Sequence, residues 1–253
     1  MRYKITLSYS GSDFCGWQVQ PRDPSVQSTL QDALSKLLGA ETSVTGAGRT
    51  DTGVNAVNYV AHFDYAGDID YTQLRYKLNA ILPSSVAVSE VIPVPEDFHA
   101  RFGATVREYT YFLHTLKDPF VSKYSLPYFY QLDFEAMNRA AQSLIGTHDF
   151  SCFEKTGADN KTSVCTIYEA GWHKYTPTHV SVMNAGAGEY WYFRIAADRF
   201  LRNMVRAIVG TLLETGRGKR DVESISELID SQDRCLAGES VPGYPLFLSS
   251  IKY

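Results

Sequence analysis

Residues 46–56 read Gly-Ala-Gly-Arg-Thr-Asp-Thr-Gly-Val-Asn-Ala, and the rest of the chain is organised around this stretch. Three glycines within eight residues predict a loop with unusual backbone dihedrals or a close backbone approach. Apolar segments with the pattern of strands flank it. The loop carries a cation, Arg49, two residues before a carboxylate, Asp51. A solvated turn is one interpretation, and a reactive loop held on a rigid scaffold is the other.

The composition is that of a globular protein with a large core. The chain has 253 residues, of which 44% are hydrophobic and 21% charged, which predicts one large domain or two small ones. No apolar run approaches membrane-spanning length and the first residues lack a signal-peptide block, so we expect a cytoplasmic protein that does not contact a membrane. The four cysteines form no CxxC pair, which predicts reduced thiols.

The charge is unevenly distributed. The net charge of -4 argues against a nucleic-acid binder. However, residues 194–220 contain seven Arg or Lys and two acids, whereas residues 221–233 contain five acids and no base. A positive face is therefore compatible with the negative total.

Hydrophobic periodicity predicts two successive sets of strands and helices. The first set comprises a strand at 2–10, a helix at Ser25–Leu38, a strand at Asn58–Tyr65, a helix at Tyr71–Ile81 and a strand at Val86–Val94. With the strand-like apolar segment before Gly46 counted as well, the order is strand, helix, strand, strand, helix, strand, which is that of a ferredoxin-like unit. The second set comprises strands at Ala104–His114, Lys161–His173, Tyr190–Ala196 and Leu246–Tyr253, with helices at Phe134–Ile145, Arg199–Thr215 and Asp221–Ser231. We interpret it as a looser copy of the first.

The segment from Arg199 to Thr215 has the clearest helical pattern. At about 100° per residue, its apolar residues share one broad face, namely Leu201, Met204, Val205, Ile208, Val209 and Leu212. Arg199, Arg202 and Arg206 would share the opposite face. Such a basic face is either solvated or suited to phosphate contacts.

Tyr109 and Tyr111 lie two residues apart in a predicted strand, so their side chains share a face. Core packing is the ordinary role of such a pair, and stacking on an unpaired base is the alternative. The six histidines lack HxxxH or HExxH spacing, which predicts no metal site.

Asp51-Thr52-Gly53 also spells the triplet of aspartic proteases, in which two aspartates share a proton. The sequence has one copy, so this function would need a dimer. Arg49 would keep the carboxylate ionised, which opposes proton sharing. We therefore rank this function last.

Residues 48–54, Gly-Arg-Thr-Asp-Thr-Gly-Val, resemble the Gly-Arg-Thr-Asp-x-Gly-Val signature of the tRNA pseudouridine synthase A (TruA) family. Further segments are similar to this family in the same order along the chain. They are Tyr9 and Gly11 with Phe14-x-Gly16-Trp17-Gln18-x-Gln20-Pro21, Val26-Gln27-x-x-Leu30, Phe98-His99-Ala100-Arg101-Phe102, Arg107-x-Tyr109-x-Tyr111, Gly146-Thr147-His148-Asp149-Phe150 and the segment from Phe200 to Gly210.

The resemblance implies an isomerase that converts uridine to pseudouridine in the tRNA anticodon stem-loop without cofactor or metal. Asp51 would be the nucleophile and would attack either the uracil ring or the ribose anomeric carbon. Arg206 would pair with Asp51 and keep it charged, and Tyr109 would stack on the target base and help to remove its C5 proton. Arg49 would hold open the space that the flipped uridine leaves. Leu246 would pack beneath the base.

Thr50, Asn55, Arg199 and Arg202 are further candidates for RNA contact under this resemblance. Asn55 stands where the family commonly has His, and this change removes a possible cation. Pro245 stands in a segment that usually reads Pro-Pro-x-Gly-Leu in the family, and proline fixes φ and removes a donor.

Element order and resemblance together predict an α+β fold of two ferredoxin-like, RNA-recognition-like halves, residues 1–98 and 99–253. The halves would form a continuous, mainly antiparallel sheet with helices on one side and the catalytic cleft between them. We expect a homodimer in which one tRNA contacts both subunits. The contrasting hypothesis is a non-catalytic RNA-binding module, which would bind stem-loops whether or not Asp51 is present.

Overall fold

The computed structural model describes residues 1–157, 161–183 and 189–253. The chain forms two compact units, Met1–Val106 with Phe247–Tyr253, and Arg107–Leu246. Both combine helices with mainly antiparallel strands, so the predicted α+β class is confirmed. None of the helices in the described ranges is long and apolar enough to cross a membrane.

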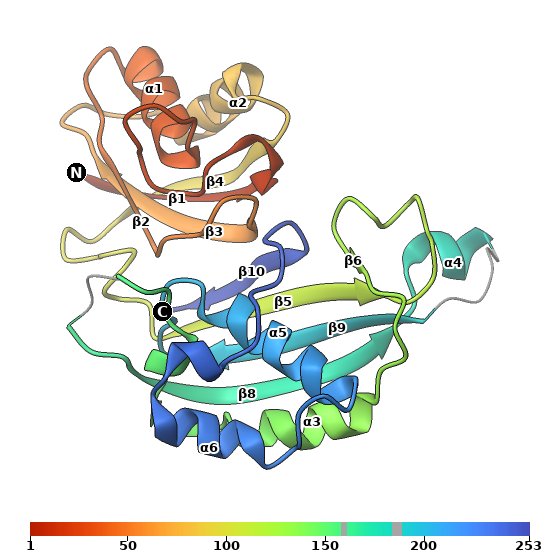
Figure 1. Ribbon diagram of the computed structural model, residues 1–253. Helices are drawn as coiled ribbons and strands as arrows, with labels where there is room; N and C mark the ends of the chain where they lie inside the picture. The colour runs from red at the N-terminus through yellow and green to blue at the C-terminus, as the bar shows by residue number, and fades with distance from the viewer. Residues whose placement is uncertain (158–160, 184–188) are drawn as a thin grey trace. The chain divides into compact units, whose positions relative to one another are not determined.

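The first unit is a sheet with two helices on one face (Figure 1). Its elements are β1 (Arg2–Tyr9), α1 (Val26–Leu38), β2 (Val44–Gly46), β3 (Asn55–Asp64), α2 (Tyr71–Ile81), β4 (Val86–Val94) and β10 (Leu246–Lys252), with a 3₁₀ turn at Gly11–Asp13. β1 lies between β4 and β3 and is antiparallel to both, β2 is antiparallel to β3, and β10 is parallel to β3. The predicted order of strands and helices in residues 1–98 is confirmed.

The local sequence explains why α1 forms and how it packs. Ser25 caps its start through a capping box with Ser28, and Gly39 ends it with a φ of 68°, which glycine adopts without strain. Leu30 and Leu34 are fully buried, each contributing about 2 kcal/mol from burial. In the sheet beneath, alternate β1 residues, from Tyr3 to Tyr9, point inward.

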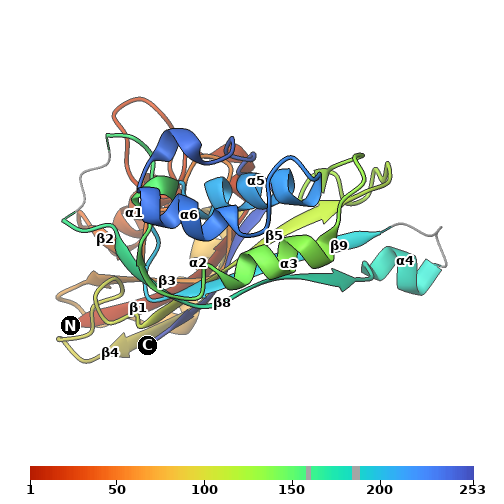
Figure 2. The same ribbon diagram turned by 60° about the horizontal axis from the view of Figure 1, so that its bottom comes forward.

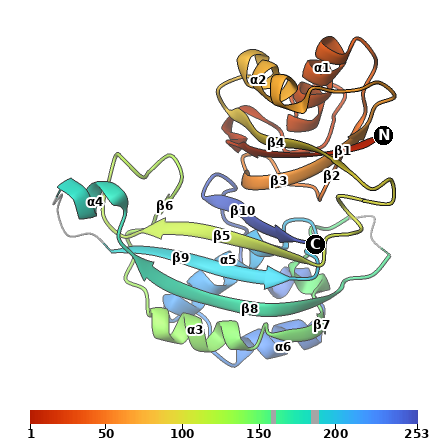
Figure 3. The ribbon, with the colours of Figure 1, turned by 180° about the vertical axis from the view of Figure 1, so that it is seen from behind.

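The second unit is a sheet whose helices α3, α5 and α6 cover one face (Figures 2 and 3). Its elements are β5 (Val106–His114), β6 (Leu126–Pro127), α3 (Phe134–Gln142), β7 (Gly146–Asp149), β8 (Val164–Tyr175), α4 (Thr178–Met183), β9 (Tyr190–Ala197), α5 (Met204–Gly216) and α6 (Ser224–Ser231), with 3₁₀ turns at Ser151–Phe153 and Arg234–Leu236. The strand order is β5-β9-β8-β7, and β6 is parallel to β5.

Several predicted boundaries differ from the structure by two to five residues, and two of them lie at a residue with a left-handed φ. α5 begins at Met204 rather than Arg199, because Asn203 has a left-handed φ of 66° that interrupts a helix. β3 begins at Asn55 rather than Asn58, because Asn58, with a φ of 52°, lies in a bulge that the strand passes through. The short elements β6, β7 and α4 had no clear periodicity in the sequence.

Helix α5 packs closely on the segment that precedes β10. A Cβ added to Gly210 would lie 1.8 Å from the carbonyl oxygen of Glu239. The Gly238 N–H donates to Thr211 Oγ1, and the Val241 N–H donates to the Arg206 carbonyl. Only glycine at position 210 allows the backbone of residues 238–241 to pack this closely on α5.

We predict that Gly210→Ala destabilises the protein although alanine is the better helix former. The clash with backbone costs about 2 kcal/mol, which lowers Tm by roughly 4–8 °C in a chain of this size. Calorimetry measures this effect. Gly216→Ala serves as the comparison, because the nearest atoms there belong to the flexible Met137 and Leu132 side chains, and its loss in Tm should be smaller. A Tm for Gly210→Ala at or above wild type would contradict the packing argument.

Candidate active site

The glycine-rich loop leads from β2 to β3 in the first unit. Arg49 and Thr52 are exposed and Asp51 is half-buried, whereas Thr50 between them is only 7% exposed. The Val54 N–H donates to the Asp51 carbonyl and closes a turn. The loop thus buries one hydroxyl and presents a cation and a carboxylate beside it.

Two tyrosine hydroxyls from the sheet hold this loop. The Tyr9 and Thr50 hydroxyls lie 2.8 Å apart in a buried hydrogen bond. The Tyr59 hydroxyl donates to the Gly48 carbonyl and accepts from the Gly48 N–H. A buried backbone group without a partner costs about 1–3 kcal/mol, so these hydroxyls stabilise one conformation of the loop.

The opening segment of the chain forms the other side of the loop. The Trp17 N–H donates to the Thr50 carbonyl over 3.2 Å, and the Trp17 ring lies 4.2 Å from that of Tyr59. Gly16 has a φ of 94°, and a Cβ on it would lie 2.3 Å from the Thr50 carbonyl oxygen. A Cβ on Gly11 would lie 2.3 Å from the carbonyl oxygen of Val54. Both glycines are needed for close backbone approach.

Asn55 is 2% exposed and its Oδ1 accepts the Gly11 N–H over 2.9 Å. The side chain therefore ties the opening segment to the first residue of β3. Phe247 and Leu248 pair with Asn55 and Ala56, respectively, so β10 runs beside the start of β3. Leu246, the residue before Phe247, is 4% exposed.

In the second unit, Tyr109 and Tyr111 lie on β5, opposite Ile195 and Phe193 of β9. Tyr109 is 9% exposed, and its ring packs edge-on against Phe200 at 5.1 Å. Tyr111 is fully buried, and burial raises the pKa of its phenol far above the usual range. Its hydroxyl donates to the Pro242 carbonyl. Tyr111 is therefore a core residue, the ordinary role for such a tyrosine.

Arg206 lies on α5 and is half-buried, with its Nε donating to the Val241 carbonyl over 2.7 Å. The expectation that Arg199, Arg202 and Arg206 share one helix face is wrong, because the first two precede α5. Arg202 is exposed, and its carbonyl accepts the Lys155 N–H. The predicted apolar face is confirmed for the residues that lie on α5, since Met204, Val205, Ile208, Val209 and Leu212 are buried, whereas Leu201 is buried but precedes the helix.

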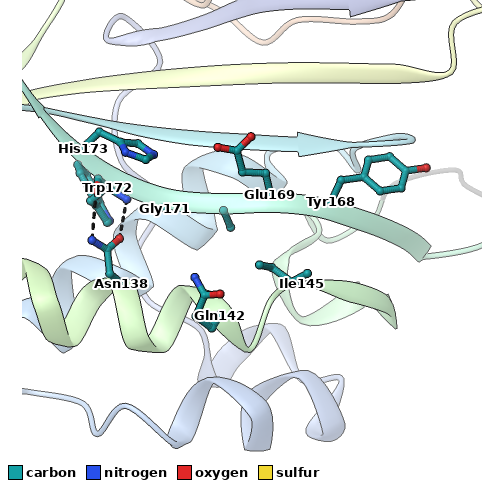
Figure 4. Close-up of a pocket in the computed structure, with 9 residues that line it drawn as sticks. Asn138, Gln142, Ile145, Tyr168, Glu169, Gly171, Trp172 and His173 are labelled. Carbon is teal, nitrogen blue, oxygen red and sulfur yellow. Dashed lines mark hydrogen bonds between the residues drawn. The ribbon is translucent and has the colours of Figure 1, made fainter.

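The two recorded cavities lie away from the predicted residues. One of about 420 Å³ lies between α3 and β8 (Figure 4) and is lined by Asn138, Gln142, Ile145 and residues 168–173. The Asn138 side-chain amide donates to the Trp172 carbonyl and accepts from the Trp172 N–H there. It thus supplies hydrogen-bond partners for one residue of β8. The other, of about 270 Å³, is lined by Met1, Arg2, Asp64 and Glu96. Neither cavity is lined by residues of the 46–56 loop, by Tyr109 or by Arg206.

Within the described ranges, no group of three or more His, Cys, Asp or Glu side chains is arranged to hold a metal ion. Sequence reasoning gave Tyr59 no role, and it gave Tyr9 only a place in the first strand and in the resemblance. The partner of each hydroxyl became visible only in the folded loop.

Comparison with known proteins gives matches along the chain. A family model described as tRNA pseudouridine synthase matches residues 5–103 and 140–253. The chain is 48% identical over 252 residues to tRNA pseudouridine synthase A of Bacteroides thetaiotaomicron, covering 100% of this chain and 90% of the relative. It is 47% identical over 255 residues to that of Parabacteroides distasonis (100% and 96% covered) and 39% identical over 257 residues to that of Bacillus subtilis (100% and 98% covered).

We predict that Tyr59→Phe loosens the loop while the sheet stays folded. The change leaves two backbone groups of Gly48 without this partner, at a cost of about 1–3 kcal/mol. Amide hydrogen exchange at Gly48 to Val54 should accelerate by roughly tenfold or more, since local opening is governed by local free energy.

Tyr3→Phe is the matched control, because Tyr3 is also buried on the inward face of β1 but its hydroxyl donates only over long distances, 3.5 Å to the Gly67 carbonyl and 3.8 Å to Met1 Sδ. In Tyr3→Phe, the amides from Gly48 to Val54 should exchange at the wild-type rate. Equal exchange in Tyr59→Phe and wild type would show that the hydroxyl does not hold the loop.

Proposed function

The chain belongs to the tRNA pseudouridine synthase A (TruA) family, and we propose from this membership that it isomerises uridine in the tRNA anticodon stem-loop through Asp51, Tyr109 and Arg206. The observation that carries the proposal is the Gly48–Val54 loop, whose signature fits the family and whose backbone is held so that Asp51 stands beside a buried Thr50. Such pre-ordering of a reactive group is what catalysis requires.

The reaction is an isomerisation in which nothing is oxidised. The glycosidic C–N bond breaks, the uracil ring turns, a C–C bond forms from C5 to the sugar, and the C5 proton is lost as N1 gains one. Asp51 would form a transient covalent bond, with either the uracil ring or the ribose anomeric carbon, and is regenerated at the end. This scheme needs neither a cofactor nor a metal.

In this proposal, Asp51 of the first unit and Tyr109 and Arg206 of the second share one cleft between two ferredoxin-like halves, residues 1–98 and 99–253, whose sheets join. Arg206 would keep the nucleophile charged, and its bond to the Val241 carbonyl fixes the direction of its guanidinium. Tyr109 would stack on the target base, supported by its edge contact with Phe200. Leu246 would pack beneath the base.

The remaining candidates fall into two groups. Arg49 and Arg202 are exposed and Arg199 is half-exposed, so they would contact the RNA directly, Arg49 at the gap left by the flipped uridine. Thr50 and Asn55 are buried, so they would act on the RNA through the loop they hold. We also propose a homodimer that shares one tRNA, working in the cytoplasm, where the four unpaired cysteines stay reduced.

We predict that Asp51→Asn abolishes the reaction. Tritium release from tRNA labelled at C5 of uridine should fall by roughly 1000-fold or more, because the amide cannot act as the nucleophile. The Kd for tRNA should stay within about twofold of wild type.

Asp32→Asn, which changes an exposed carboxylate of α1, is the control and should release tritium at the wild-type rate. Retained activity in Asp51→Asn would end the nucleophile assignment. Wild-type protein that binds tRNA but releases no tritium would support the non-catalytic RNA-binding module instead.

We further predict that Arg206→Ala lowers kcat by roughly 100-fold or more near neutral pH. A carboxylate that loses its cationic partner favours the neutral form, which is a poor nucleophile. Arg206→Lys should recover only part of the rate, because lysine lacks the planar fork. Arg139→Ala, at an exposed position of α3, controls for loss of a positive charge. Full activity in Arg206→Ala would remove this residue from the site.

A further inference from the structure

The segment from Phe98 to Phe102 belongs to the pattern shared with the family, and the chemistry proposed above does not use it. In the structure these residues form the loop that follows β4 in the first unit. Ala100 at its centre is fully buried, whereas Phe102 is 78% exposed. We call residues 98–103 the Phe102 loop.

Hydrogen bonds within the Phe102 loop fix its shape. The His99 Nδ1 accepts the N–H groups of both Arg101 and Phe102, each over 3.1 Å. The Gly103 N–H donates to the His99 carbonyl over 2.8 Å, and a Cβ on Gly103 would lie 3.0 Å from that oxygen. The turn is therefore tight, and the direction of the Phe102 side chain is set by its backbone.

Two residues from the sheet anchor the loop at Ala100. The Ala100 N–H donates to His62 Nδ1 over 3.1 Å, and the Tyr253 hydroxyl donates to the Ala100 carbonyl over 2.7 Å. Burial is the largest cause that lowers the pKa of His62 to about 4, and the positive charge of Arg2 adds to it. His62 is thus neutral at physiological pH and can accept this hydrogen bond.

The exposed ring has an aromatic neighbour and a cationic neighbour. The His99 imidazole lies 4.4 Å from the Phe102 ring with an angle of 33° between the planes. The Arg101 guanidinium carbon lies 5.7 Å from the ring centroid. An aromatic ring that is held in place, exposed to solvent and flanked by arginine is the arrangement on which proteins stack unpaired bases.

We propose that Phe102, with Arg101 beside it, is a stacking platform for a second unpaired base of the tRNA, distinct from the uridine that reacts. The inference rests on tRNA being the substrate, as proposed above. Because the loop is already ordered, stacking on it costs little conformational entropy.

The surroundings favour a base over other partners. A stable protein interface buries about 800 Å² on each side, far more than one ring offers, whereas a nucleobase needs only one ring face. Acidic Glu96 and Asp97 act on nearby Arg2, so the local charge is too balanced for a phosphate site. Phe102 and Arg101 are therefore better suited to stacking on a base than to binding a phosphate.

The platform and the signature loop are both attached to β3. His62, the anchor of the platform, pairs with Thr45 of β2, and the loop runs from the end of β2 to Asn55 at the start of β3. One tRNA bound at the loop can therefore also contact the platform. The second base would thus fix the position of the tRNA while the target uridine enters the site.

The test measures the Kd of an unmodified tRNA transcript for wild type and for Asp51→Asn, each with and without changes at Phe102. Phe102→Ala should raise Kd by roughly 5- to 150-fold in both backgrounds, the range found when a stacked aromatic is removed. Phe102→Tyr should stay within about twofold, whereas Phe102→Leu, apolar but not aromatic, should lose affinity like Phe102→Ala. Tyr76→Ala, which removes an aromatic residue of α2 that is 74% exposed, is the matched control and should bind like wild type.

Each other outcome has a distinct meaning. If Phe102→Ala binds tRNA as tightly as wild type, the assignment of Phe102 as a stacking platform is wrong, and the proposed reaction is unaffected. If Phe102→Leu keeps full affinity, the contact is merely apolar and the stacking assignment fails. A change in sedimentation coefficient without a change in Kd would assign Phe102 to a protein partner and overturn the proposal. Wild type that does not bind tRNA at all would instead refute the proposed function.

Discussion

The hydrogen bonds from the Tyr9 and Tyr59 hydroxyls to Thr50 and Gly48 are the constraint on which the candidate site depends. A loop with three glycines within eight residues has many conformations open to it, and ordering it costs entropy. The sheet offsets this cost by supplying buried partners for the polar groups of the loop, which in a dry environment could not be left unpaired. Thr50 is thereby drawn inward, whereas its neighbours Arg49 and Asp51 are exposed and half-buried, respectively.

Three segments far apart in the sequence meet at the start of β3, and this explains why the site needs the whole first unit. The opening segment brings Gly11 and Gly16 against the carbonyls of Val54 and Thr50, at distances that no side chain allows. β10, more than 180 residues later, pairs with Asn55 and Ala56. Parallel pairing over such a separation carries a large loop-closure cost, so the strand must be held by burial, and Leu246 and Leu248 are indeed buried.

Much of the fold could be read from local pattern, because amphipathic periodicity, the Ser25 cap and the Gly39 stop all act within a few residues. Two of the element boundaries that failed lie at single left-handed residues, Asn58 and Asn203, whose φ is set by the folded surroundings. Asn203 also separates Arg199 and Arg202 from the helix that carries Arg206, so a helical wheel could not place them. For the site, the resemblance identified the signature loop, but the buried roles of Thr50 and Asn55 depend on long-range partners, Tyr9 and the Gly11 N–H.

Pro245 differs from the pattern of the family, and the hydrogen bonds around it explain why the path of the chain is unchanged. Three carbonyls of the segment before β10 accept hydrogen bonds: Val241 from Arg206 Nε, Pro242 from the Tyr111 hydroxyl, and Pro245 from the Phe112 N–H. A proline lacks the N–H but keeps the carbonyl, so Pro245 can still accept from Phe112. The N–H groups of Val241 and Leu246, which donate to the Arg206 and Gly243 carbonyls, belong to other residues. Substitution by proline here therefore leaves intact the contacts that fix the direction of Arg206, and the path of the chain into β10 is preserved.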